Sequence, residues 1–288
     1  YAHGDEEFAH AVIDALLRFA EAGVLLKTVE PYTANRQKCW SSADASCPMH
    51  HVQTAAEFFI NATHAAVLVQ AWLNAQPMKK KKIDVWLDEG FDYVKGLADL
   101  QGTGPNGSLY EYMNGKAGVL VYAIYRDDPK LFLNYAKVGL AQIARHMDDD
   151  GYIYNNSWRG SRALWYYSLG LGAVFGFGEL LEAQGIRFFD HPLLKDRLRK
   201  SYGSALKGSR DWKWFESKGT RGSNFISDAD RARRHLHQSA SSLQWIGAWR
   251  YPDIGQSSLP GGFDSVSGIW SDCMYADRED LLSKQKWI

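Results

Sequence analysis

The segment GYIYNNSWRGSRALWYYSLGLG, residues 151–172, concentrates side chains that could do chemistry. Two arginines and three aromatic residues fall within nine positions, namely Arg159, Arg162, Trp165, Tyr166 and Tyr167. In a helix Tyr166 lies one turn after Arg162 on the same face, whereas Tyr167 is turned about 100° away. One face can therefore present a fixed cation and a phenol together.

A cation beside a phenol suits the β-elimination that cleaves a 4-linked uronate. The proton next to a carboxylate is hard to remove until donors such as Asn and Arg neutralise the carboxylate charge. A Tyr or His then takes the proton, and another group protonates the leaving oxygen. A phenol with a pKa of about 10 is a poor base, so an adjacent arginine that favours the phenolate would help. Asn114 and Lys116, near the start of an expected helix, are further candidates.

The same residues also fit purely structural roles. Tyr166 and Tyr167 are compatible with core aromatics that keep a hydroxyl at the rim. Asn114 is compatible with a helix N-cap. His64 lies on an apolar helix face and is compatible with a buried core histidine.

Other chemistries lack their usual sequence patterns. The histidines and the three cysteines do not show CxxC or HExxH spacing, and there is no Gly-rich phosphate loop or GxSxG elbow. We therefore expect no metal and no cofactor. Lys plus Arg and Asp plus Glu both number 33, which argues against a nucleic-acid binder. No run of eighteen apolar residues occurs, so no membrane span is expected.

Apolar positions recur at helical spacing, and sustained two-residue alternation is absent. The expected helices span residues 5–26, 50–76, 83–100, 110–126, 130–147 and 160–184. Short turns between long helices favour antiparallel hairpins, so the predicted fold is all-α, an incomplete α/α toroid. We expect a single domain over residues 1–288, loop-rich from about residue 252, and a monomer. The lysine run 79–82 is expected to be a solvated turn.

Residues 187–234 carry thirteen Lys and Arg against six Asp and Glu. This segment is expected to line one side of a groove and to attract a polyanion. Tryptophans are expected to stack on sugar rings there, and the candidates are Trp158, Trp165, Trp245 and Trp249. Cys39 and Cys47 lie close together in a polar loop and suit a disulfide, which favours an oxidising compartment. The expected location is therefore secreted or periplasmic.

Three segments in order give the chain a family resemblance. They are VIDALLRFAEAGVLL at 12–26, KVGLAQIARHMDDDGYIYNNSWRGSRALWYY at 137–167 and LQWIGAWRYPD at 243–253. Together they cover roughly residues 10–255, and they resemble the alginate lyases of polysaccharide lyase family 5. The resemblance implies an incomplete α/α toroid that splits poly-mannuronate by β-elimination.

The resemblance also assigns residues. Arg162 matches the family's arginine, Tyr166 matches the first tyrosine of the R-A-L-x-Y motif, and Asn114 matches the second asparagine of N-N-H. The family's histidine falls on Gly115 and its second tyrosine on Leu169. Tyr166, one turn before Leu169, could reach the same space. The other proton-transfer role is open to Tyr167, His146, His64, Tyr112 or Lys116.

The sequence thus predicts a lyase acting on an acidic polysaccharide, with Asn114, Arg162, Tyr166 and Tyr167 as catalytic candidates. Candidates for substrate binding are Lys116, Arg159, Trp165, His64, Gln53, Trp249 and Arg250. Two alternatives remain, an inactive sugar-binding relative of the lyases and an α/α glycoside hydrolase. The hydrolase would need two carboxylates across a groove, for which Glu111 and Asp148 to Asp150 are the candidates.

Overall fold

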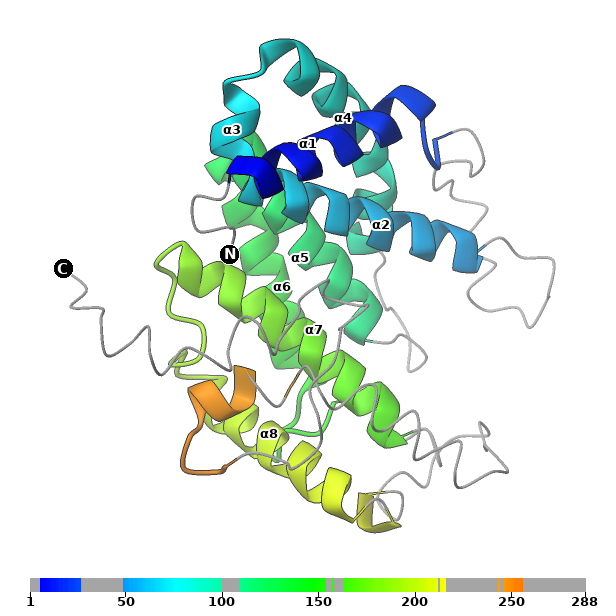
Figure 1. Ribbon diagram of the computed structural model, residues 1–288. Coiled ribbons are helices and arrows are strands. Elements are labelled where there is room, and N and C mark those ends of the chain that lie inside the picture. Colours follow the sequence, from blue (N-terminus) through cyan, green and yellow to red (C-terminus); the bar gives the residue numbers. More distant parts are fainter. Residues whose placement is uncertain are drawn as a thin grey trace. The chain divides into compact units, whose positions relative to one another are not determined.

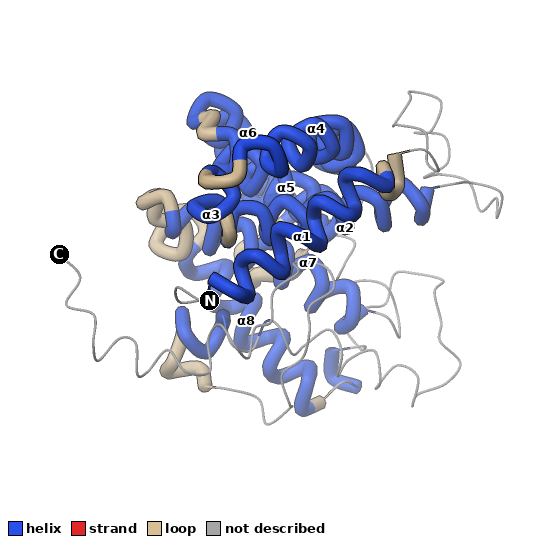
Figure 2. The backbone as a smooth tube through the Cα atoms, turned by 45° about the horizontal axis from the view of Figure 1, so that its top comes forward, coloured by secondary structure: helices blue, strands red, loops and turns tan. Residues whose placement is uncertain are grey.

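The computed structural model describes residues 6–26, 49–99, 109–153, 157, 163–211, 213–215, 243 and 246–255. Eight named helices run along these residues (Figure 1): α1 (Glu6–Ala22), α2 (Met49–Leu68), α3 (Gln70–Asn74), α4 (Pro77–Asp99), α5 (Leu109–Arg126), α6 (Pro129–His146), α7 (Ala163–Ala183) and α8 (Lys195–Arg210). Within the described ranges there is no strand (Figure 2). Met147 and Ile153 form an isolated antiparallel bridge. The prediction of an all-α fold is confirmed.

The chain divides into two compact units. Unit 1 comprises Tyr1–Leu100 and Asn114–Lys137, and unit 2 comprises Gln101–Met113 and Val138–Ile288. The boundaries fall within α5 and within α6. The single domain and the toroid stay predictions, and the proposed Cys39–Cys47 disulfide lies outside the described residues.

Two details of the predicted helices are corrected in unit 1. The expected helix 50–76 is interrupted at Val69, between α2 and α3. Pro77 begins α4 instead of ending a helix, because its fixed φ and missing N–H suit the first helical position. The lysine run is therefore helical, not a turn. Its side chains pair with acidic groups along and beside α4, Lys79 with Asp14 and Lys80 with Asp84.

An aromatic cluster between α2 and α4 forms the core of unit 1. The Phe59 ring stacks on Tyr93 with centroids 5.8 Å apart and lies 5.1 Å from the Trp86 ring. Gly90 provides the space, since a Cβ there would lie 2.1 Å from Phe59 Cδ1. All three aromatic residues are nearly inaccessible to solvent. Packing of α2 on α4 thus depends on a ring that occupies the place of a side chain at position 90.

Helices α4 and α5 run antiparallel and are joined by phenol–carboxylate hydrogen bonds. Tyr122 Oη donates to Asp88 Oδ1 at 2.6 Å, and Tyr125 Oη donates to Asp84 Oδ1 at 2.6 Å. Arg126 adds ion pairs to both carboxylates, at 3.6 Å to Asp84 and 3.5 Å to Asp88. Acceptors four residues apart on α4 meet donors three residues apart on α5, so these contacts fix the register of the pair.

In unit 2, α7 is apolar on almost every side. Its buried residues include Phe175 and Phe177, which pack on Phe189 and Phe188 with ring centroids 5.3 and 6.1 Å apart. A helix that is hydrophobic all round belongs inside its domain. We conclude that α7 is the central helix of unit 2, and that only a minority of its residues are partly exposed.

The packing at Gly90 gives a test of the unit 1 core. Gly90→Ala forces the Phe59 ring to move, and we expect a loss of about 1–3 kcal/mol in the free energy of unfolding, measured in urea. The matched control is Gly203→Ala in α8, where a Cβ meets nothing within 4 Å. There alanine is expected to be neutral or to stabilise by up to about 1 kcal/mol. Equal effects of the two changes would contradict this description of the core.

Candidate active site

Asn114 lies in the interior of α5 and is buried, with 3% of its surface exposed. Because α5 begins at Leu109, Asn114 is not the N-cap of this helix, so that structural alternative is wrong. The side-chain nitrogen Nδ2 has no hydrogen-bond partner within the described part of the chain. A buried amide nitrogen without a partner costs stability. Three other buried polar atoms also lack a partner among the described residues, Asn61 Oδ1, Ser168 Oγ and Tyr251 Oη, so the role of Asn114 also depends on its place in the sequence motif.

Gly115 explains why no histidine follows this asparagine. A Cβ at position 115 would lie 2.5 Å from the backbone nitrogen of Ala98 and 2.7 Å from the backbone carbon of Leu97. The backbones of α5 and α4 touch at this point. No side chain fits, so the departure from the family motif is a requirement of helix packing.

Lys116 is buried against the end of α4, with 2% of its surface exposed. Its Nζ donates to the carbonyl oxygen of Ala98 at 2.7 Å. Burial lowers the pKa of Lys116 to about 8, and the nearby Asp99 carboxylate opposes this effect. The contact satisfies a carbonyl in the last turn of α4, which favours a structural role over direct substrate binding.

Two residues of α2 were predicted to bind substrate. His64 Nδ1 lies 3.1 Å from the carbonyl oxygen of Ile60, which only accepts, so Nδ1 carries the proton. Burial lowers the pKa of His64 to about 4, and the ring is therefore neutral at ordinary pH with Nε2 as an acceptor. Gln53 Nε2 donates to Glu57 at 3.0 Å. Neither contact tests binding, so both assignments remain predictions.

On α7, Trp165, Tyr166 and Leu169 form a partly exposed stripe on an otherwise buried helix. The Trp165 and Tyr166 rings lie with centroids 4.9 Å apart. Tyr166 and Leu169 share a face because they are three residues apart. The role of Tyr166 in proton transfer stays a prediction. Arg159 and Arg162 lie outside the described residues, as do Trp158 and Trp245.

Tyr167 has a different environment from its neighbour. Its side chain is completely buried, and its hydroxyl lies 2.9 Å from the carbonyl oxygen of Gly151 and 3.0 Å from that of Ser201. Burial raises the pKa of the Tyr167 phenol above its ordinary value. A phenol that keeps its proton and donates it to backbone carbonyls favours a structural role, so between the two tyrosines we favour Tyr166 for proton transfer. Two other proton-transfer candidates, Tyr112 and His146, are also largely buried.

Arg250, another predicted binding residue, is held by Glu179 of α7. Its Nε and Nη2 donate to the two carboxylate oxygens at 2.7 and 2.8 Å, and its guanidinium lies 4.4 Å from the centre of the Phe189 ring. The bidentate pair ties residues 246–250 to α7 and favours a structural role for Arg250. Trp249 beside it is partly exposed and stays a prediction.

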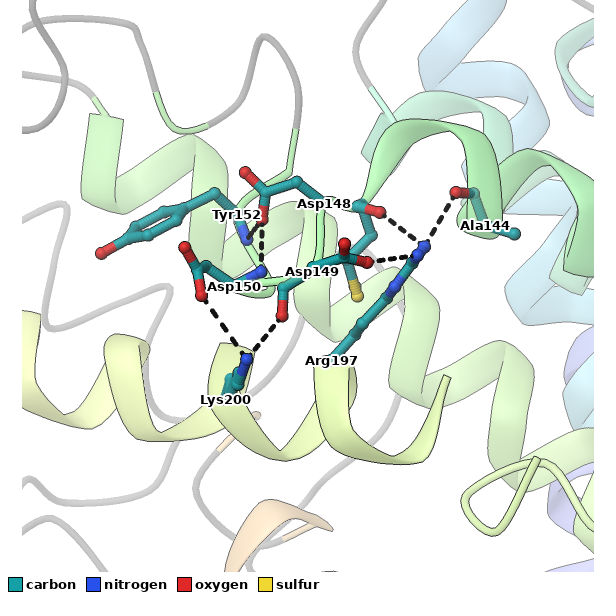
Figure 3. A network of polar contacts seen from close by, with 8 residues as sticks. Ala144, Asp148, Asp149, Asp150, Tyr152, Arg197 and Lys200 are labelled. Carbon is teal, nitrogen blue, oxygen red and sulfur yellow. Dashed lines mark hydrogen bonds and ion pairs between the residues drawn. The ribbon is translucent and has the colours of Figure 1, made fainter. Parts of the chain in front are cut away.

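The described basic residues of the segment 187–234 mostly serve the fold. Arg197 of α8 donates to the carbonyl oxygens of Ala144 and Met147 at 3.1 and 3.0 Å and pairs with Asp149 (Figure 3). Lys200 donates to the Asp149 carbonyl oxygen at 2.8 Å and pairs with Asp150 at 3.5 Å. Further contacts join Arg187 to Asp190, Arg199 to Asp253 and Lys207 to the face of Trp214. The local charge excess therefore overstates the positive surface that these residues offer to a polyanion.

The contacts of the turn at residues 148–150 weaken the case for a glycoside hydrolase. Asp148 Oδ1 accepts from the backbone nitrogens of Asp150 and Tyr152 at 3.0 and 2.8 Å (Figure 3). Asp149 and Asp150 pair with Arg197 and Lys200. The three carboxylates thus have structural partners, while the side chain of Glu111 lies outside the described residues.

Some of these contacts were missed at the level of sequence, although their spacing carried a signal. Arg197 and Lys200, three residues apart on α8, match the consecutive aspartates of the 148–150 turn.

Within the described ranges, no group of three His, Cys, Asp or Glu side chains could hold a metal ion. None of the helices described here is long and apolar enough to cross a membrane.

Comparison with known families gives one result. The sequence profile described as alginate lyase matches residues 30–211, which contain α2 to α8. The motif-bearing segment 137–167 lies within the match, whereas the segments 12–26 and 243–253 lie outside it. A search of curated proteins finds no significant match.

The buried Lys116 gives a pH-dependent prediction. Between its folded pKa of about 8 and its ordinary value of 10.5, the unfolded chain binds a proton that the folded chain has lost. The free energy of unfolding of the wild type should therefore rise with pH in this window relative to Lys116→Met, by at most about 1.4 kcal/mol per pH unit. Below the window the burial penalty is present in full. Urea unfolding of both proteins across the window measures this, and a pH-independent difference would contradict it.

Proposed function

Because the chain belongs to the alginate lyase family, we propose that it depolymerises an acidic polysaccharide by β-elimination. The substrate is a 4-linked polyuronate, either alginate rich in mannuronate or a related polymer such as glucuronan. The observation that carries the proposal is the buried Asn114 side chain, whose Nδ2 has no partner among the described residues and which lies in a helix within the family match. A donor kept free in this way suits a substrate carboxylate better than it suits the fold.

The proposed reaction removes the proton from C5 of the uronate, next to the carboxylate. Asn114 and Arg162 neutralise the carboxylate, which stabilises the charge that develops as the proton leaves. Tyr166 reacts as its phenolate, which takes the C5 proton and becomes the phenol, while the C5–H electron pair forms the C4–C5 double bond and the C4–O4 bond breaks. The leaving O4 takes a proton from a second group or from water. Every atom is thus accounted for without a cofactor.

The partly exposed stripe of Trp165, Tyr166 and Leu169 supports the role of Tyr166. A leucine at the position of the family's second tyrosine leaves an apolar surface next to the Tyr166 phenol. Apolar surroundings strengthen electrostatic interactions in a site. We propose that Trp165 stacks on a sugar ring beside it, and that the protein works as a monomer outside the cytoplasm, as a secreted or periplasmic enzyme.

The rival function is a sugar-binding relative of the lyases without activity. The observation in its favour is that Gly115 and Leu169 replace the family's histidine and second tyrosine. It predicts affinity for a polyuronate without bond cleavage. A cleavage assay therefore distinguishes the lyase from the inactive sugar-binding relative.

The first experiment is incubation with poly-mannuronate, poly-guluronate, glucuronan and hyaluronan, following the ultraviolet absorbance of the conjugated product. We expect absorbance to rise with at least one polyuronate. Tyr166→Phe, prepared identically, should lower the rate by roughly a hundredfold or more and so controls for a contaminating lyase. No rise on any polymer at high protein concentration would refute the lyase function, and binding without a rise would establish the rival.

Replacement of Asn114 separates a functional amide from a structural one. Asn114→Leu removes a donor that has no described partner, so the free energy of unfolding should change little or increase. Activity should fall by roughly 10²–10³-fold, the cost of losing one charge-stabilising donor. The matched control is Thr63→Val in α2, a buried residue whose Oγ1 donates to the Phe59 carbonyl oxygen at 2.7 Å. The control should lose about 1 kcal/mol of stability and keep its activity; the reverse pattern would exclude a catalytic role for Asn114.

A further inference from the structure

Tyr166 and Tyr167 are consecutive residues of α7 in opposite environments. Tyr166 is partly exposed, whereas Tyr167 is completely buried. Successive helical residues point about 100° apart, so the direction of one side chain fixes the direction of the other. Any contact that holds Tyr167 in place therefore also aims Tyr166.

The Tyr167 hydroxyl bridges two elements of unit 2. It can donate to the carbonyl oxygen of Gly151 in the turn after α6, and to that of Ser201 in α8. The Ser201 hydroxyl donates to the same Gly151 carbonyl oxygen. The Tyr167 ring also packs on Phe215, with centroids 4.9 Å apart. The first turn of α7 is thus fastened to a second helix and to a turn.

The turn itself is held rigidly. Gly151 has a φ of +80°, which favours glycine, and a Cβ there would lie 2.5 Å from the carbonyl oxygen of Arg197 and 2.6 Å from the nitrogen of Ser201. On the other side of the turn, Arg197 and Lys200 hold Asp149 and Asp150 (Figure 3). The hydroxyl of Tyr167 consequently bonds to a fixed carbonyl, not to a loop that can follow it.

We propose that Tyr167 is a positioning residue, whose bonds to Gly151 and Ser201 set the rotation of the first turn of α7 and so aim the Tyr166 phenol at the substrate. This inference rests on the proposed lyase function. The two tyrosines then have separate tasks, one reacting and one orienting. Small errors in the placement of a reacting group are costly because the rate depends steeply on its geometry.

The test is Tyr167→Phe, which keeps the ring and removes the hydroxyl. We expect kcat to fall by about tenfold with KM nearly unchanged, because the substrate still binds while the phenol is less well aimed. Amide hydrogen exchange of residues 163–170 should become faster, since the first turn of α7 loses its fastening.

The matched control is Tyr202→Phe. Tyr202 is a completely buried tyrosine of unit 2 whose hydroxyl donates to the carbonyl oxygen of Gly255 at 3.0 Å, away from the first turn of α7. It should lose similar thermal stability but keep kcat and the exchange rates of residues 163–170. Equal effects of the two variants, or unchanged exchange in Tyr167→Phe, would overturn the proposal. If the wild type cleaves no polyuronate, the lyase function fails, and hydrogen exchange alone still decides whether Tyr167 fixes the α7 turn.

Discussion

Direct contact between the backbones of α4 and α5 is the constraint on which unit 1 depends. At Gly115 there is no room for a Cβ against the backbone of Leu97 and Ala98, and at Gly118 a Cβ would lie 2.7 Å from the Val94 side chain of α4. Helices that approach so closely exclude water from the residues between these glycines and beside them. The burial of Asn114 and of the Lys116 ammonium follows from this approach. An amide nitrogen without a partner among the described residues and a lysine with a lowered pKa are therefore two results of one packing event.

Unit 2 depends on a different set of interactions, the hydrogen bonds and ion pairs that hold the 148–151 turn against α8. Three consecutive aspartates would repel one another in an isolated peptide. In the folded chain one of them accepts backbone N–H groups and the other two pair with basic residues of α8. Gly151 then allows the turn to lie directly on α8, where its carbonyl receives hydroxyls from Tyr167 and Ser201. The basic residues of α8 that the sequence predicts to attract a polyanion thus pair with acidic residues of the same unit.

Most buried polar groups described in the two units have hydrogen-bond partners, and a few do not. Near the turn of unit 2, buried hydroxyls and charged groups are paired. In unit 1, Tyr122 and Tyr125 are paired with carboxylates on the same pair of helices that leaves Asn114 Nδ2 without a described partner. Asn61 Oδ1, Ser168 Oγ and Tyr251 Oη also lack a partner among the described residues, so the free donor of Asn114 is informative together with its match to the asparagine of the sequence motif. This is the physical basis for assigning Asn114 to the substrate carboxylate.

The sequence alone determined the all-α class, most of the helices and the family, because apolar spacing and short motifs are local properties of a chain. It also selected Tyr166 and Asn114. It could not separate Tyr166 from Tyr167, or a reactive Asn114 from a helix cap, since these choices depend on where a helix begins and on what lies against each of its faces. Tertiary structure excluded the helix cap for Asn114, through the start of α5 at Leu109, and showed the Tyr167 hydroxyl beside the carbonyls of Gly151 and Ser201. The partners of Arg197, Lys200 and Arg250 lie 48 to 71 positions away in the chain. The spacing of Arg197 and Lys200 matches that of the aspartates, but only the folded chain shows that these residues meet.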